Sequence, residues 1–142
     1  LDKIKNWNRF YGGSGFVQYQ FVLPKQYSLD GIKSILSIIK KSGEKSSLAV
    51  LKLFGKQNDN YLSFPIEGYT LALDFKNTPK IQKLFSELDE VVKSFNGRIY
   101  LAKDSRSKKQ VILSGYPKIQ NFKNQFFNQK YFSSYLSKRL FG

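Results

Sequence analysis

The sequence predicts an α+β domain of the ferredoxin-like βαββαβ type: an antiparallel sheet with helices on one face and a C-terminal helical tail. Four runs rich in aromatic and β-branched residues alternate in polarity, and two longer runs repeat apolar residues at helical spacing. These runs follow one another in the order strand, helix, strand, strand, helix, strand. The chain has 142 residues, enough for one hydrophobic core, so we expect residues 1–142 to form a single domain.

The first strand and the first helix have clear ends. Alternating residues predict a strand over 16–23, which Pro24 ends. Ser28 is placed to cap a helix over 29–41, and Gly43 suits the position just after its last turn. The apolar side chains at helical spacing in this stretch are Ile32, Ile35, Leu36 and Ile39.

The middle of the chain predicts two more strands and a second helix. The strands are expected over 47–54 and 68–75, and Thr78 with Pro79 opens the helix, which Gly97 closes. The apolar face of this helix consists of Ile81, Leu84, Phe85, Leu88, Val91, Val92 and Phe95. The remaining elements are expected to be a strand over 98–102 and tail helices over 107–114, 117–128 and 133–140.

Alternation along the strands assigns each side chain to one of two faces of the sheet. The face expected toward the helices is apolar and carries Val17, Tyr19, Phe21, Ala49, Leu51, Leu53, Tyr69, Leu71 and Leu73. The opposite face is expected to be open and carries Gln18, Gln20, Lys52, Phe54, Thr70, Arg98 and Tyr100, with Lys103 at its edge. A mixture of apolar and polar groups is typical of a ligand site, whereas an ordinary solvated face of an antiparallel sheet is also polar.

Composition excludes several kinds of site. The chain has no Cys and no His, which removes disulfides, thiolate chemistry, the commonest general base and the commonest metal ligand. The carboxylates lack metal-ligand spacing, so we expect no metal site. No apolar run approaches the roughly 20 residues that span a bilayer. We therefore expect a protein that is cytoplasmic or peripherally associated with a membrane.

The net charge and the absence of an initial methionine say less about the function of the chain. The formal net charge is +14, a balance compatible with nucleic acid, an anionic membrane or an acidic partner. The lysines are scattered along the sequence and form no stripe, so we expect no nucleic acid partner. The sequence has no Met, including at position 1, and we expect it to be part of a longer protein.

Four segments carry a recognisable pattern. They are Trp7-Asn8 with Tyr11-Gly12 and Gly15-Phe16; Gln18-Tyr19-Gln20-Phe21; Lys52 to Gly55 with Leu62-Ser63-Phe64-Pro65 and Gly68; and Gly97-Arg98 with Tyr100 and Ala102-Lys103-Asp104-Ser105-Arg106. In order and spacing they resemble the C-terminal, substrate-binding half of FAD-linked oxidases of the vanillyl-alcohol-oxidase superfamily. Within it, they are most similar to the group of decaprenylphosphoryl-β-D-ribose 2′-oxidases and aldonolactone oxidases.

The resemblance implies an oxidoreductase that uses FAD to oxidise a CH–OH group of a sugar, sugar lactone or prenyl-phosphoryl sugar. This chain would form the wall over a flavin held by an upstream FAD-binding domain and would be inactive alone. Lys103 and Tyr100 match catalytic positions at the flavin, and Gln20 matches a further cofactor contact. The matching substrate contacts are Gln18, Gln20, Lys52, Phe54 and Thr70. A reductase partner is compatible with the resemblance.

The sequence departs from this group at several positions. Thr70 stands where the relatives have an asparagine, and Ala72 where they have a cysteine. The polar wall is therefore altered, and inhibitors of those relatives that attack the thiol would find no target. Near the end, Phe132, Ser134, Lys138-Arg139 and Leu140 fit the closing helix of the group, but Tyr135 replaces an aspartate.

Two other functions remain open at this point. An RNA-recognition-type module has the same βαββαβ order, and its open sheet stacks bases on aromatic side chains. Here the third strand reads Gly68-Tyr69-Thr70-Leu71-Ala72-Leu73-Asp74-Phe75, which places its aromatics on the helix side and an aspartate on the open side. The other alternative is a ferredoxin-like regulatory or interaction domain.

Overall fold

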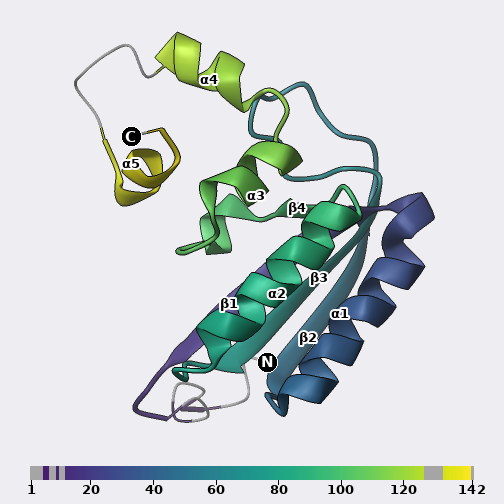
Figure 1. Ribbon diagram of the computed structural model, residues 1–142, viewed down its shortest axis with the longest axis vertical. Helices are drawn as coiled ribbons and strands as arrows, with labels where there is room; N and C mark the ends of the chain where they lie inside the picture. The colour runs from purple at the N-terminus through teal and green to yellow at the C-terminus, as the bar shows by residue number, and fades with distance from the viewer. Residues whose placement is uncertain (1–4, 7–8, 10–11, 127–132, 142) are drawn as a thin grey trace.

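A computed structural model describes residues 5–6, 9, 12–126 and 133–141, and it confirms the expected fold class. The sheet is antiparallel, with the strand order β2-β3-β1-β4. Its strands are β1 (Phe16–Pro24), β2 (Ser46–Phe54), β3 (Gly68–Lys76) and β4 (Arg98–Ile99). The helices α1 (Ser28–Ser42) and α2 (Ile81–Ser94) lie together over one face of the sheet (Figure 1).

The helical tail lies beyond the β4 end of the sheet (Figure 1). It consists of α3 (Lys109–Gly115), α4 (Ile119–Phe126) and α5 (Tyr135–Phe141), and two short 3-10 turns, η2 (Lys25–Tyr27) and η3 (Leu101–Lys103), occur earlier. Trp7, Asn8, Tyr11 and Phe132, which contribute to the resemblance, lie outside the described residues, as does the expected end of helix 117–128. In the described ranges, no helix has the length and apolar character needed to cross a membrane.

A continuous pairing of β1 with β3 organises the core. The register runs from Phe16 opposite Lys76 to Pro24 opposite Gly68 without a bulge. It points alternate residues toward the helices, as expected. The buried side chains between the sheet and the helices include Tyr19, Phe21, Leu23, Ile35, Ile39, Leu71, Leu73, Phe75, Leu84, Phe85, Leu88 and Val92.

The outer strand departs from the expected burial. Leu51 and Leu53 lie on the helix side because they pair with Leu71 and Tyr69, yet their exposed fractions are 55% and 58%. Their assigned side is therefore right, but the expectation that helices cover them is wrong. The physical reason is that β2 is the last strand of the sheet, so the helices bury the middle strands first.

Two expected helix starts also differ in detail. Ser28 does not cap α1; it is the first helical residue, and its hydroxyl bonds to the carbonyl oxygens of Leu23 and Pro24 at 3.0 and 2.9 Å. The second helix begins at Ile81, and the Thr78 carbonyl accepts a hydrogen bond from the Ile81 N–H in the preceding turn. Gly43 behaves as predicted, with a left-handed backbone (φ 76°) at the end of α1.

Gly97 follows α2 for a packing reason. The left-handed residue at this helix end is Asn96, with φ 54°, which the sequence analysis did not identify. Gly97 donates its N–H to the Val92 carbonyl at 2.8 Å and lies against β1. A Cβ on Gly97 would come within 2.7 Å of the Val22 carbonyl oxygen, so the close approach requires a glycine.

The fourth strand is shorter than expected. Only Arg98 and Ile99 form it, and Tyr100 adds one further bond from its N–H to the Gln20 carbonyl, 2.9 Å away. The chain then turns through η3 and leaves the sheet. The expected strand over 98–102 is therefore wrong in length, and the edge of β1 before Gln20 is left uncovered by β4.

Two ion pairs fix the segment that follows. The Asp104 carboxylate accepts backbone N–H bonds from Arg106 and Ser107 at 3.1 and 2.8 Å, and its other oxygen lies 2.5 Å from Arg139 of α5. Arg106 forms a two-pronged pair with Asp89 of α2, with both distances 3.0 Å. The turn after β4 is thereby tied to α2 and to the tail.

Replacing Gly97 by Ala should destabilise the fold by about 1–3 kcal/mol, the range usual for an overpacked site. The added Cβ would lie 2.6 Å from Leu23 Cδ2 and 2.7 Å from the Val22 carbonyl oxygen. The free energy of unfolding in urea measures the effect. Gly55→Ala is the matched control because a Cβ at Gly55 meets no atom within 4 Å. Equal losses in the two variants would contradict the packing argument.

Asp104→Asn should lower stability by about 1–3 kcal/mol at pH 7 because charge-assisted hydrogen bonds are lost. Burial alone would raise the pKa of Asp104, but the N–H groups of Ser107 and Arg106 and the Arg139 guanidinium outweigh it and hold the pKa below its ordinary value. This stabilisation is present above the unfolded pKa of about 4 and is lost as pH falls through the folded value.

Urea unfolding at pH 7 and at pH 3 tests this prediction. The difference between wild type and Asp104→Asn should be large at pH 7 and smaller at pH 3. The control is Asp59→Asn, which removes a fully exposed carboxylate that lies 3.8 Å from Lys118. A stability difference for Asp104→Asn that does not change with pH would refute an ionic role.

Candidate functional site

The strand register arranges the open face of the sheet as a grid. One row across the strands contains Leu48, Asp74 and Gln18; the next contains Val50, Ala72 and Gln20; the third contains Lys52, Thr70, Val22 and Arg98. The polar residues predicted from alternation therefore do share one face. The rows also show which of them are close enough to act together.

Lys103 is linked to the first row by a side-chain hydrogen bond. Its ammonium group, at the end of η3, donates a hydrogen bond to the side-chain oxygen of Gln18. The Gln18 amide nitrogen in turn donates to the Asp74 carboxylate at 2.6 Å. Lys103 is exposed, whereas Asp74 is only 4% exposed. The result is a chain of hydrogen bonds from a buried anion, through an amide, to an accessible cation.

Gln20 belongs to a second, separate contact. Its amide nitrogen lies 3.3 Å from the Thr70 hydroxyl, which donates to the Phe21 carbonyl at 2.7 Å. Thr70 is 1% exposed. The structure therefore places Thr70 behind Gln20, where it holds the glutamine, and its predicted contact with substrate stays a prediction.

A notch lies where β4 stops covering β1. Its volume is about 140 Å³. Its lining includes Gln18, Gln20 and Lys103, together with Gln82 and Phe85 of α2. Pockets that enclose a small molecule measure roughly 300–1,000 Å³. The notch is thus accessible to a ligand, but this chain alone supplies only part of an enclosing wall.

Aromatic side chains form the neighbouring part of the open face. Phe64, from the segment between β2 and β3, stacks on Tyr100 with ring centres 4.5 Å apart and meets Phe54 edge-on at 5.8 Å. Arg98 holds the same segment by donating to the Ser63 carbonyl at 2.6 Å and to the Gln57 side chain at 2.8 Å. The expectation of a fully open face is therefore wrong here, because the chain's own loop covers Arg98.

Lys52 lies on the outer strand, away from the notch. It is exposed and pairs with Thr70 on β3, so it is separated from β1 by two strand spacings, or about 10 Å. The structure brings Gln18, Gln20, Tyr100 and Lys103 together around the end of β4. It leaves Lys52 and Phe54 on the outer strand, within reach of a larger ligand only.

A second polar cluster lies on the helix side and has a structural role. The Tyr19 hydroxyl donates to Asp89 at 2.9 Å, and Arg106 pairs with the same carboxylate. Burial raises the pKa of Asp89, while the Arg106 guanidinium and the Tyr19 hydroxyl oppose the rise. Burial, followed by the nearby Asp89 charge, also raises the pKa of Tyr19. The Tyr19 and Asp89 side chains are almost fully buried, and Tyr19 and Arg106 also line the notch, so the cluster supports the notch from the helix side.

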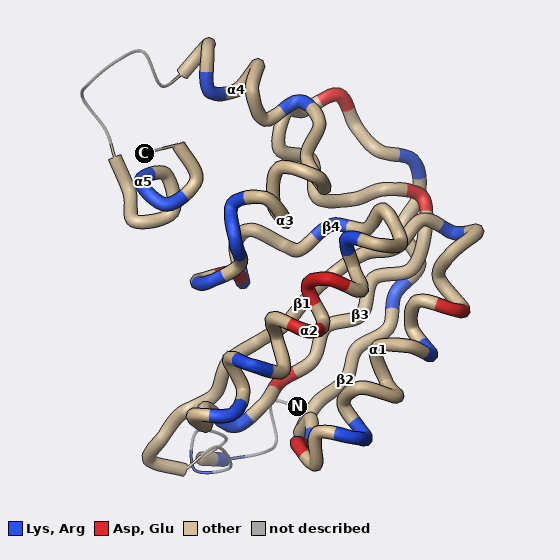
Figure 2. Tube along the Cα trace, in the orientation of Figure 1, with Lys and Arg blue, Asp and Glu red and all other residues tan. Residues whose placement is uncertain are grey.

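Charge and metal-binding groups add little to the site. Lysine and arginine positions are spread along the described part of the trace, from α1 to α5 (Figure 2). Among the described residues, no group of carboxylates is arranged to hold a metal ion. The chemistry of the open face therefore rests on amides, a hydroxyl, aromatic rings and the Lys103 ammonium group.

Sequence reasoning missed two members of the site. Phe64 was quoted for the resemblance but received no role, although it supports Tyr100 from a loop with no periodic pattern. Alternation places Asp74 on the open face but assigns it no role. The signal for Asp74 was the strand pairing, since only the register reveals that it stands opposite Gln18.

Comparison with known proteins identifies relatives that share part of their sequence with this chain. No protein-family model matches the chain. It is 43% identical over 122 residues to decaprenylphosphoryl-beta-D-ribose oxidase of Mycolicibacterium smegmatis, a match that covers 86% of this chain and 26% of that protein. It is 30% identical over 112 residues to an uncharacterized protein in the mprA 5′ region of Streptomyces coelicolor, covering 78% of this chain and 30% of that protein. The chain is therefore homologous to about a quarter of an oxidase, and it spans less than a third of either relative.

Proposed function

We propose that this chain is the substrate-binding domain of a longer FAD-dependent oxidoreductase, and that it forms the substrate-side wall over the flavin. The substrate is a CH–OH group of a prenyl-phosphoryl sugar, a sugar or a sugar lactone. The observation that carries the proposal is the position of Lys103 beside Gln18 at the notch, in a chain 43% identical to part of such an oxidase.

The donor groups at the notch fit a flavin ring. An isoalloxazine presents carbonyl oxygens and ring nitrogens that accept hydrogen bonds, and the notch offers the Lys103 ammonium group and two glutamine amides. The reaction would transfer a hydride from the carbinol carbon to bound FAD and release the hydroxyl proton to solvent, which would leave a ketone or a lactone. Bound FAD supplies the two-electron acceptor for this step.

Lys103 has the central role in this reaction. A fixed positive charge beside the acceptor stabilises the negative charge that develops there as the hydride arrives. Because Gln18 accepts a bond from Lys103, the ammonium group has a defined position before substrate binds. Preorganisation of this kind lowers the barrier because no group has to reorient during the reaction.

The remaining open-face residues suit substrate binding. Gln20, held by Thr70, lines the notch, and Tyr100, stacked on Phe64, lies next to Gln20 through its backbone hydrogen bond. Both residues orient the sugar ring. Lys52, on the outer strand, binds a more distant anionic group such as the phosphate of a prenyl-phosphoryl sugar. The small volume of the notch supports a second wall, contributed by an FAD-binding domain of the same polypeptide.

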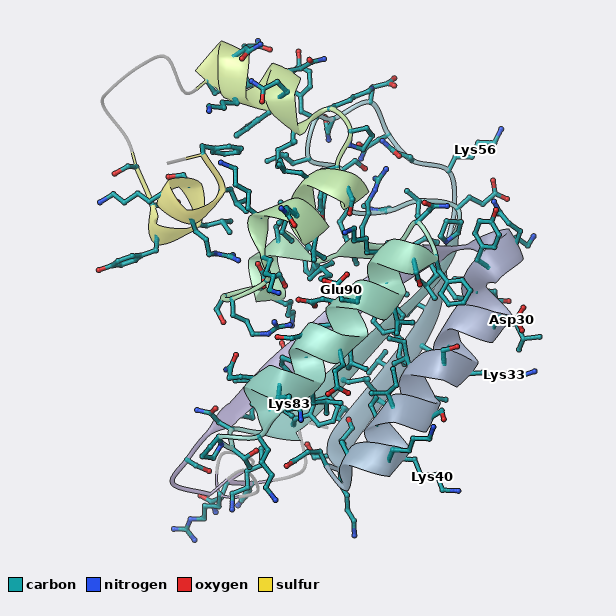
Figure 3. All side chains as sticks on the ribbon, in the orientation of Figure 1. Asp30, Lys33, Lys40, Lys56, Lys83 and Glu90 are labelled. Atoms are coloured by element: carbon teal, nitrogen blue, oxygen red, sulfur yellow. The ribbon has the colours of Figure 1, made fainter. Side chains whose placement is uncertain are left out.

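Lys103→Ala in the full-length protein should abolish reduction of the flavin by substrate while leaving flavin content unchanged. The purified protein is mixed anaerobically with prenyl-phosphoryl pentoses, sugar alcohols and aldonolactones, and flavin absorbance is followed. Lys33→Ala is the matched control, because Lys33 projects away from the sheet on α1 (Figure 3). Near-normal bleaching by Lys103→Ala would refute the assigned role. A folded wild-type protein without flavin would refute the function itself.

A further inference from the structure

We propose that Asp74 is the positioning residue for Lys103 and acts through the side chain of Gln18. This inference rests on the proposed function, because it explains how the cation at the notch is held in place. Asp74 does not face the notch and is not offered as a base. Its effect is to determine which end of the Gln18 amide points to Lys103.

The hydrogen-bond chemistry of Asp74, Gln18 and Lys103 allows only one orientation of the Gln18 amide. A carboxylate can only accept hydrogen bonds, an ammonium group can only donate them, and an amide has one end of each kind. Gln18 lies between them, with its nitrogen 2.6 Å from Asp74 and its oxygen toward Lys103. A flipped amide would set oxygen against the carboxylate and nitrogen against the ammonium group, and both contacts would be repulsive.

Burial strengthens the contact at the Asp74 end. The residue is 4% exposed, so its hydrogen bond with Gln18 is little weakened by water. The unbroken β1–β3 register holds the two residues directly opposite each other. Lys103 comes from a different part of the chain, 85 positions away from Gln18, and is exposed. The sheet therefore supplies a fixed anchor for a flexible side chain.

Gln20 provides an internal contrast. It lies two positions along the same strand and also faces the notch. Its partner is the Thr70 hydroxyl, at 3.3 Å, and a hydroxyl can either donate or accept. The direction of the Gln20 amide is thus set only indirectly, through the bond that Thr70 makes to the Phe21 carbonyl. We expect Gln18 to be rigid and Gln20 to adapt to the substrate.

The first test uses the 142-residue chain and needs no activity. The side-chain amide of Gln18, assigned by its disappearance in Gln18→Met, should be as rigid by ¹⁵N relaxation as ordered backbone, whose order parameter is about 0.85. Asp74→Asn should mobilise it, because an asparagine can donate as well as accept and so permits both amide orientations. Asp30→Asn, which removes an outward-pointing carboxylate from α1, should leave it rigid (Figure 3).

The second test uses the full-length enzyme. Asp74→Asn should lower kcat roughly tenfold to hundredfold with little change in KM, because an interaction needed in the transition state is weakened. Gln18→Met removes the connection, so adding Asp74→Asn to it should cause no further loss. Asp30→Asn should keep wild-type kcat.

Each outcome separates the two proposals. A mobile Gln18 amide in the wild-type chain overturns the inference even if Asp74→Asn does not fold. Equal kcat in Asp74→Asn and Asp30→Asn, or independent losses from Asp74→Asn and Gln18→Met, also overturns it while leaving the function of Lys103 intact. If Lys103→Ala itself keeps normal turnover, the proposed function fails, whatever the behaviour of Asp74.

Discussion

The pairing of β1 with β3 is the constraint on which the rest of the structure depends. Side chains alternate between the two faces of a strand, so a shift of one residue would exchange the core with the site. The observed register puts Phe21 and Leu73 against the helices and sets Gln18 opposite Asp74 on the other face. Burial of the apolar set therefore determines where the polar set lies. The positions of the site residues are well defined because the core on the opposite face of the sheet is closely packed.

The early end of β4 creates the opening that this polar set uses. Had the strand continued past Ile99, it would have covered the edge of β1, and Lys103 would belong to a hydrogen-bonded ladder. Instead the chain turns, and Lys103 lies toward the notch. Asp104 pairs with Arg139, and Arg106 pairs with Asp89. Neighbouring charged residues thus have separate roles: one stays exposed at the site, and two fix the turn that presents it.

Much of this arrangement could be predicted from sequence, because periodicity reports directly which residues share a face. The order of elements and the face assignments of Gln18, Gln20 and Tyr100 followed from alternation alone. The length of β4 could not, since Leu101 and Ala102 suit a strand as well as a turn. The exposure of Leu51 depends on the sheet order, and the position of Phe64 depends on a loop without a periodic pattern. The family resemblance predicted the chemistry of the site, whereas the contact between Asp74 and Gln18 became evident only from the strand register.

The two polar clusters on either side of β1 differ in a way that bears on function. On the helix side, the buried Tyr19 and Asp89 and the half-buried Arg106 bond to one another, an arrangement typical of a structural ionic cluster. On the other side, the buried Asp74 is linked to an exposed Lys103 by one amide. If stability were the only requirement, the exposed cation would contribute little, as surface ion pairs generally do. A buried anion that orients an exposed cation instead favours an external, negatively charged partner for that cation. In the function proposed above, the negative charge that develops on an acceptor during hydride transfer would be a partner of this kind.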